Sequence, residues 1–379
     1  MAIQISGTTV IDNSKNVTVG ASASITAGSA FIANGYVGLG VTDTTGRDAG
    51  VGTATGTMIY NESSVQVELW DGTAWVGGLT SPFSATGGTK DTTSRSGYAV
   101  HTFTGSGTLV AAGGPPAGVT GEYLVIGGGG AGGDGSSSGG GGGGGLLRFS
   151  DSFTLTPGTY TIGVGAGGAI AANPGYTAPS YGVGNPGSPS YIVNPGITSI
   201  TSPGGGGGGG GGTPGASTRN GLPGGSGGGG GSTYPTPGPS VGGSGTGDPG
   251  GTTDSNSPAN GWGNDGGAGN HFSNGQGGGG GGGAGGNGGN WIPPSFGGPG
   301  GVGLTYSIDG SSTGRAGGGN GALNSGLPAW GGGSGIPFAG GTATVNTGGG
   351  GGGSANGISP NSTGASGIVI IAYPTAINN

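Results

Sequence analysis

Residues 123–145 read YLVIGGGGAGGDGSSSGGGGGGG, a short apolar run that passes directly into glycine. Glycine accounts for 115 of the 379 residues and proline for a further 24. Because glycine inside a helix or strand costs about 0.5–1 kcal/mol relative to alanine, the chain cannot rely on helices and ordinary sheets throughout. The quoted stretch therefore joins two kinds of structure, one built by apolar side chains and one built by glycine.

The glycines are collected in blocks rather than spread evenly. The longest blocks are Gly127–Gly130, Gly139–Gly145, Gly204–Gly212, Gly227–Gly231, Gly277–Gly283 and Gly348–Gly353. They lack the strict Gly-X-Y period that collagen requires. Glycine segments in a left-handed threefold helix, packed side by side, can satisfy each other's backbone N–H and C=O groups. The blocks therefore predict a polyglycine II bundle with turns at each end, the alternative being a flexible linker.

Short β-branched and aromatic runs predict conventional strands outside the blocks. In the first 80 residues these runs are Ile3–Ile5, Thr8–Ile11, Val17–Val19, Gly56–Tyr60, Val65–Trp70 and Thr73–Val76. Asp71-Gly72 supplies a hairpin turn between the last two. Further strands are expected at Tyr98–Thr104, Thr108–Val110, Tyr123–Ile126, Phe153–Leu155 and Tyr160–Val164.

The strongest strand signal is the run IVIIAY at 368–373, which Pro374 ends. A continuous apolar run of this length is typical of a strand that is buried on both faces. The most similar run is Tyr123–Ile126, so we expect the two to pair. The glycine-rich stretch between them is then a long insertion, which is tolerable because loop-closure entropy grows slowly with length.

These elements predict an all-β chain with essentially no α-helix, in which a small β-sandwich scaffold carries the polyglycine II-type bundle. We expect an N-terminal β-region at 1–80, a linker at 81–96, a glycine-rich domain at 97–374 and a C-terminal tail at 375–379. Within the domain, the expected scaffold segments are 97–126, 146–168 and 366–374, and the expected bundle and loops are 127–145 and 169–365.

The charged residues argue against several functions. Lys and Arg number only seven against fourteen Asp and Glu, and they are spread singly, so no nucleic-acid footprint is present. His101, which we expect on a strand, and His271 fit no catalytic or metal-binding spacing. There is no cysteine for a disulfide or thiolate site, and no apolar run approaches the length of a membrane span. We therefore expect no enzyme activity, cofactor, metal or membrane insertion.

Aromatic and histidine side chains lie in the inserts between the glycine blocks, at Tyr234, Trp262, His271, Phe272, Trp291 and Trp330. A bundle collects such inserts at its ends. Aromatic side chains on loops can stack on sugars or fill shallow pockets, which makes these six residues candidates for receptor binding. The alternative is that they cap the bundle or mediate contacts between subunits.

Four stretches resemble, in this order, the glycine-rich domain of structural proteins predicted in marine and cyanobacterial phages: Tyr98–Thr108, Glu122–Gly130, Leu155–Gly167 and Ser366–Ile371. Upstream, Gly56–Asn61 together with Trp70–Trp75 resembles a short module of phage fibre and virion-surface proteins. The resemblance implies a β-scaffold with glycine-rich rods on a virion. Such a protein is made in the host cytoplasm and released by lysis, in keeping with the absence of an export signal.

The resemblance further implies a tail-fibre or adhesin subunit that contributes to host-cell recognition and is exposed on the particle surface. Its expected partners are further copies of itself, as a trimer by analogy with fibre proteins, other virion proteins through the N-terminal region, and a host surface glycan or outer-membrane protein. A capsid decoration or other architectural appendage is the alternative. An ice-binding polyglycine II protein is a more remote one.

Overall fold

The structure is a computed structural model that describes residues 10–11, 17–18, 40–50, 55–63, 66–77, 82–115, 117–135, 137–170, 182–212, 219–232, 240–270, 276–294, 296–324, 326, 330–335, 340–355 and 362–375. Their regular secondary structure is nearly all β-strand, which confirms the predicted fold class. The helix α1 (Thr44–Gly50) is the one α-helix in that part of the chain. The chain divides into two compact units, Met1–Leu79 and Thr80–Asn379.

The described residues of the first unit form two small sheets. In one, β1 (Val10–Ile11) pairs antiparallel with β2 (Val17–Thr18). The other has the order β3-β4-β5-β6, with bounds Gly40–Thr42, Met58–Asn61, Gln66–Trp70 and Trp75–Gly77. The predicted turn at Asp71 is confirmed, because its Oδ1 accepts hydrogen bonds from the backbone N–H groups of Thr73 and Ala74 at 2.7 and 2.9 Å. The predicted run Ile3–Ile5 lies outside the described residues.

The second unit is built around two five-stranded sheets, with the orders β15-β14-β13-β10-β7 and β12-β11-β18-β9-β8. The strand bounds are β7 Ser84–Thr86, β8 Thr89–Asp91, β9 Tyr98–Phe103, β10 Gly107–Ala112, β11 Val119–Ile126, β12 Leu147–Leu155, β13 Gly158–Gly163, β14 Ser190–Val193, β15 Ile200–Ser202 and β18 Ile368–Pro374. Leu109, Tyr160 and Ile192 of the first sheet share one buried core with Val125 and Val369 of the second. The two sheets therefore form a sandwich.

Strand β18 confirms the predicted pairing with β11. The two run antiparallel, with Tyr123 opposite Ile371, and β9 pairs with the other edge of β18. Ile371 belongs to the sandwich core, whereas Ile368 and Ile370 belong to a second apolar cluster. Neighbouring side chains along a strand point to opposite faces of the sheet. Both faces of β18 are therefore buried, as its unbroken apolar sequence predicts.

Two parts of the expected organisation need correction. The segment 81–96 is not a linker throughout, because it contains β7 and β8, which pair with β10 and β9. The segment 169–365 is not only bundle and loops: β14 and β15 extend the sandwich, and β16 (Leu304–Tyr306) pairs with β17 (Thr313–Arg315). These strands are too short to show a clear alternation in the sequence.

The β16–β17 region packs on the face of the β11 sheet that is turned away from the sandwich core. The ring of Tyr306 lies 4.7 Å from that of Phe149, measured between centroids. Arg95 adds a polar link, because its Nη1 and Nη2 donate to the two carboxylate oxygens of Glu122 at 2.7 and 2.6 Å. Nη1 also lies 3.3 Å from the carbonyl oxygen of Ile308. This region of the insertion is therefore fixed to the scaffold.

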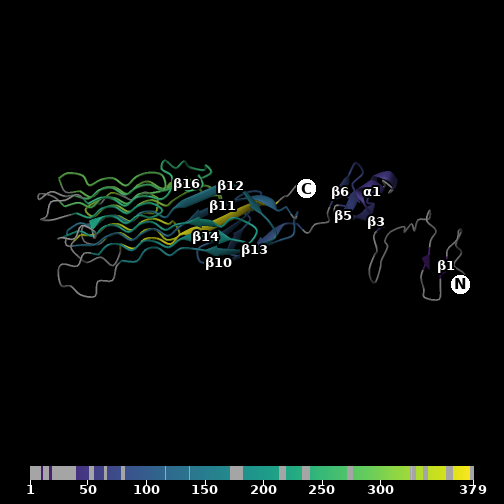
Figure 1. Ribbon diagram of the computed structural model, residues 1–379, viewed down its shortest axis with the longest axis horizontal. Helices are drawn as coiled ribbons and strands as arrows, with labels where there is room; N and C mark the ends of the chain where they lie inside the picture. The colour runs from purple at the N-terminus through teal and green to yellow at the C-terminus, as the bar shows by residue number, and fades with distance from the viewer. Residues whose placement is uncertain are drawn as a thin grey trace. The chain divides into compact units, whose positions relative to one another are not determined.

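The glycine blocks form an ordered bundle, which confirms the polyglycine II arrangement over the flexible linker. Its segments run side by side away from the sandwich (Figure 1). Within the segment 139–146, Gly141, Gly142 and Gly143 each donate a backbone hydrogen bond to a different neighbouring segment. The next three residues donate to the same neighbours in the same order. This period of three residues is that of the left-handed threefold helix.

The segment 139–146 has six neighbouring segments. It donates hydrogen bonds to three of them and accepts from three others, and the six are 203–209, 279–282, 348–354, 127–133, 226–229 and 319–322. All of its glycines are buried. A Cβ atom added at Gly140 or Gly142 would lie 2.0 or 2.1 Å from a backbone carbonyl oxygen of a neighbour. Only glycine therefore fits at these two positions.

Candidate functional site

The bundle has one end on the sandwich and one free end. Strand β11 leads into the segment 127–134, and the segment 139–146 leads back into β12. The two run antiparallel, since Gly130 N–H donates to Gly143 and Gly133 N–H donates to Gly140. Chain turns that lie beyond these segments are far from the sandwich. The free end is therefore the place where loops can contact another molecule without involving the scaffold.

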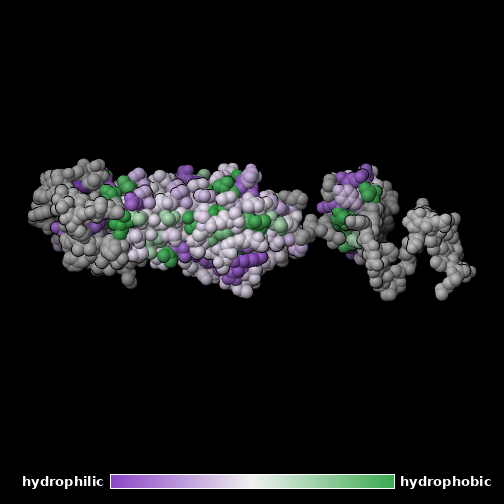
Figure 2. All heavy atoms as spheres, turned by 90° about the horizontal axis from the view of Figure 1, so that it is seen from below, coloured by the Kyte–Doolittle hydropathy of each residue, from purple (hydrophilic) through white to green (hydrophobic). Residues whose placement is uncertain are grey.

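One turn at the free end is the hairpin formed around Ile292 and Phe296. Ile292 and Phe296 exchange two backbone hydrogen bonds of 2.8 and 2.9 Å, and a cis peptide bond joins Pro293 and Pro294. The side chains of Ile292 and Phe296 are 47% and 57% exposed. Elsewhere, on the face shown in Figure 2, hydrophobic residues form small separate patches. The hairpin therefore offers an apolar contact surface.

The hairpin is assigned to the free end by the hydrogen bonds that lead to it. Gly141 and Gly144 donate to Gly279 and Gly282, so the segment 279–282 runs toward the sandwich as 141–144 does. After a turn there, the segment 286–291 runs back, because Gly280 N–H donates to Gly289. The next turn, which contains Ile292 and Phe296, therefore lies at the opposite end.

Trp291 is the one described receptor candidate at the free end. Its side chain is half-buried, and its backbone N–H donates to the carbonyl oxygen of Ala268 at 2.9 Å. Ile292 and Phe296, which follow it, were not among the residues selected from the sequence. The available signal was the apolar WIPP stretch between two glycine blocks, which marks an exposed turn.

Trp262 and Trp330 lie at the sandwich end. Trp262 exchanges backbone hydrogen bonds with Leu147 of β12 and packs against the second apolar cluster. Trp330 is 39% exposed, and its Nε1 donates to Thr305 Oγ1 of β16 at 3.1 Å. Its backbone carbonyl accepts a hydrogen bond from Gly317 N–H. The structure thus places these two tryptophans apart from Trp291, in positions that cap the bundle.

Three candidates, Tyr234, His271 and Phe272, lie outside the described residues. Their described neighbours belong to the bundle: Ser232 N–H donates to the carbonyl oxygen of Ser138 at 2.7 Å, and Asn270 N–H donates to that of Gly277 at 2.9 Å. Receptor binding by these three stays a prediction.

His101 lies on β9, as expected, and is fully buried. Its Nδ1 is 2.7 Å from the carbonyl oxygen of Gly87, and its ring stacks on that of Tyr373 with centroids 5.8 Å apart. Burial lowers the pKa of His101 below its usual value, and the positive charge of Lys90 contributes in the same direction. These contacts hold β9 in the scaffold.

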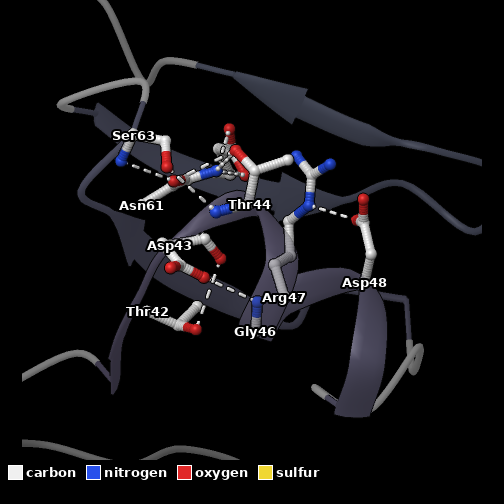
Figure 3. A network of polar contacts seen from close by, with 9 residues as sticks. Thr42, Asp43, Thr44, Gly46, Arg47, Asp48, Asn61 and Ser63 are labelled. Carbon is white, nitrogen blue, oxygen red and sulfur yellow. Dashed lines mark hydrogen bonds and ion pairs between the residues drawn. The ribbon is translucent and has the colours of Figure 1, made fainter.

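The N-terminal unit contains a polar network between α1 and its sheet (Figure 3). Asn61 and Glu68 are buried, and Asn61 Nδ2 donates to both carboxylate oxygens of Glu68 at 3.0 Å. Arg47 of α1 donates from Nη1 to Glu68 at 2.9 Å and from Nε to Asp48 at 2.7 Å. These hydrogen bonds raise the pKa of Arg47 and lower that of Asp48. The network orients the helix and leaves the charges paired.

Two kinds of feature are absent from the residues with described positions. No group of three or more His, Cys, Asp or Glu side chains there is arranged to hold a metal ion. No helix in the same residues has the length and hydropathy of a membrane span.

Comparison with known proteins agrees with this architecture. No curated protein matches the chain by sequence. The family model for a glycine-rich domain matches residues 106–374, which include the paired strands β11 and β18 and the bundle between them. The match covers well over half of the chain. On this evidence the chain belongs to the glycine-rich domain family.

Proposed function

We propose that the chain is a non-enzymatic structural protein of a bacteriophage particle, a tail-fibre or adhesin subunit that contributes to host-cell recognition. The observation that carries the proposal is the apolar turn at the free end of the bundle, where Ile292 and Phe296 are exposed. The opposite end of the bundle continues into the strands of the sandwich. A receptor bound at the turn is thus held by a backbone lattice that is anchored in a buried core.

In this proposal the N-terminal unit attaches to other proteins of the particle, and the glycine-rich domain is exposed on the particle surface. The chain assembles in the host cytoplasm as a homo-oligomer, a trimer by analogy with fibre proteins. The receptor is a surface glycan or an outer-membrane protein, since aromatic and aliphatic side chains contact both. The resemblance of 56–75 and 98–371 to phage structural proteins supports the particle location.

Binding to host cells tests the role of the turn. We expect labelled full-length protein with I292S and F296S to bind cells of the host with an affinity at least about tenfold lower than the wild type, because two apolar contacts are lost. The matched control is V345S, since Val345 is 67% exposed at the sandwich end of the bundle. Equal binding by both variants would contradict the role of the turn, and wild-type protein that binds no host cells would contradict the adhesin.

Electron cryomicroscopy of intact particles tests the location. Ordered density for the chain on a tail tip or fibre is the expected result. Density over the capsid would favour the alternative of a decoration protein, and absence of the chain from particles would exclude a virion protein of either kind.

A further inference from the structure

The sides of the bundle differ from its interior in how backbone N–H groups are satisfied. A threefold helix points its N–H groups in three directions, which repeat every third residue. In the interior each direction meets another glycine-rich segment, as it does around 139–146. A segment on the side of the bundle has at least one direction in which no further segment follows. Its N–H groups there need another acceptor.

The segment 262–270 shows which acceptor the chain uses. Gly266 N–H donates to Gly243 and Gly267 N–H donates to Gly280, which accounts for two directions. In the third direction, Asp265 N–H donates to Asn287 Oδ1 at 3.1 Å and Ala268 N–H donates to Asn290 Oδ1 at 2.8 Å. Asp265 and Ala268 are three residues apart, and so are Asn287 and Asn290. The side-chain amides thus repeat with the period of the helix and occupy the place of a neighbour's carbonyl groups.

The same substitution occurs at other side segments. Asp265 Oδ1 accepts from Gly245 N–H at 2.7 Å, and Asn220 Oδ1 accepts from Val241 N–H at 3.1 Å. Asp265 lies within a straight segment and bonds to the adjacent one. We name Asn220, Asp265, Asn287 and Asn290 the edge-capping residues, since none of the four is buried. Each supplies an oxygen that the lattice would otherwise take from another segment.

We propose that the edge-capping residues end the hydrogen-bond lattice sideways and prevent the bundle from adding a glycine-rich segment of a second copy of this chain. Bare N–H groups at three-residue intervals, about 9 Å apart, match the carbonyl groups of any other polyglycine II segment. The situation resembles the edge of a β-sheet, where an unprotected row of donors recruits another strand. A second copy of the chain carries many glycine-rich segments whose carbonyl groups could accept these hydrogen bonds. The inference does not depend on the proposed function.

The test is the double variant N287A/N290A of the full-length chain, which removes the acceptors for Asp265 and Ala268. We expect its sedimentation coefficient to rise with concentration above that of the wild type. We also expect the amides of Asp265 and Ala268 to become more protected from hydrogen exchange as the protein is concentrated. The matched control is N260A, because Asn260 is exposed but donates to the side chain of Asp248 rather than capping a backbone N–H.

The variant N287D/N290D keeps an oxygen at both positions, as Asp265 does naturally, and should sediment like the wild type. The proposal is overturned if N287A/N290A sediments like the wild type at every concentration while both amides exchange faster, since water then satisfies them. If the double variant loses its fold, the single variants N287A and N290A decide by the same measurement. Each still exposes one backbone donor.

Discussion

In the sandwich, the buried side chains of Tyr160, Ile162 and Ile371 fill the space between two sheets. In the bundle, a Cβ atom at Gly140 would already lie 2.0 Å from a neighbour's carbonyl oxygen. The sandwich thus excludes water with large apolar side chains, and the bundle excludes water by bringing backbones into direct contact. Both regions of this unit require a close-packed interior in which polar groups are hydrogen-bonded. The sandwich achieves close packing with large side chains, and the bundle achieves it with glycine, which has none.

The comparison teaches that tolerance to substitution should be reversed between the two regions. In the sandwich, loss of volume leaves a cavity. At a bundle position such as Gly140 or Gly142, a gain of volume separates segments and breaks hydrogen bonds that hold several neighbours at once.

The largest expected effect is that of Gly142→Ala at the centre of the bundle. The new Cβ would lie 2.1 Å from the carbonyl oxygen of Gly130. Gly142 N–H donates to Gly351, and its carbonyl accepts from Gly319. Overpacking together with the loss of these two hydrogen bonds should lower the free energy of unfolding by about 4 kcal/mol. Urea unfolding of the full-length protein measures the change.

The control for this prediction is Gly105→Ala in the sandwich, where a Cβ meets nothing within 4 Å. It makes the same chemical change and should alter stability by less than about 0.5 kcal/mol. If both variants were equally stable, the bundle would not depend on direct backbone contact.

A smaller effect is expected for Ile371→Ala in β18. Ile371 is fully buried in the sandwich core, so its truncation leaves a cavity and should cost about 3 kcal/mol in urea unfolding. Val110→Ala is the control on the paired sheet, because Val110 is 43% exposed and its truncation should cost less than about 0.5 kcal/mol. A cost for Ile371→Ala as small as that of the control would mean that the sandwich is not held by its core.

The smallest effect is a dependence on pH that belongs to the sandwich alone. The pKa of buried His101 is lowered, so the native state keeps the ring neutral while the unfolded chain takes up a proton near pH 6.5. Stability is therefore full above pH 6.5 and falls as the pH drops toward the native pKa, by at most about 1.4 kcal/mol per pH unit.

Urea unfolding at pH 7.5 and 5.5 should show a loss of roughly 1 kcal/mol in the wild type that is absent in H101Q. This variant retains His271, so the difference reports His101. The lowered pKa values of Asp71 and Asp91 act only at more acidic pH. An equal loss in wild type and variant would assign the pH dependence to another group.

The predictable features were those that the composition carries directly. The apolar run at 368–373 predicted a strand buried on both faces, and its similarity to Tyr123–Ile126 identified the strand with which it pairs. The glycine blocks predicted the bundle, because segments without side chains are the ones whose backbones can pack in direct contact. In both cases the residues of a short stretch are enough to indicate how that stretch packs.

The features that could not be predicted depend on neighbours that are distant in sequence. Strands β14 and β16 are short. Strand β14 is stabilised by pairing with β13, and β16 by packing in the second apolar cluster. Trp262 and Trp291 occupy equivalent places between glycine blocks, yet one lies at the sandwich and the other at the free end. The end at which an insert lies depends on the direction of its segment, which the connectivity of the whole bundle decides.

The position of β18 has a consequence for synthesis. It is the middle strand of its sheet, yet it is made some 240 residues after β11, which at 5–20 residues per second takes roughly 10–50 s. During that interval β11 and β9 are without the strand that separates them in the finished sheet. The sheet is therefore completed only when Ile368–Pro374 inserts between β11 and β9. A chain that stops before this strand leaves Leu124 and Ile126 uncovered. Incomplete copies then expose apolar surface that chaperones and proteases recognise.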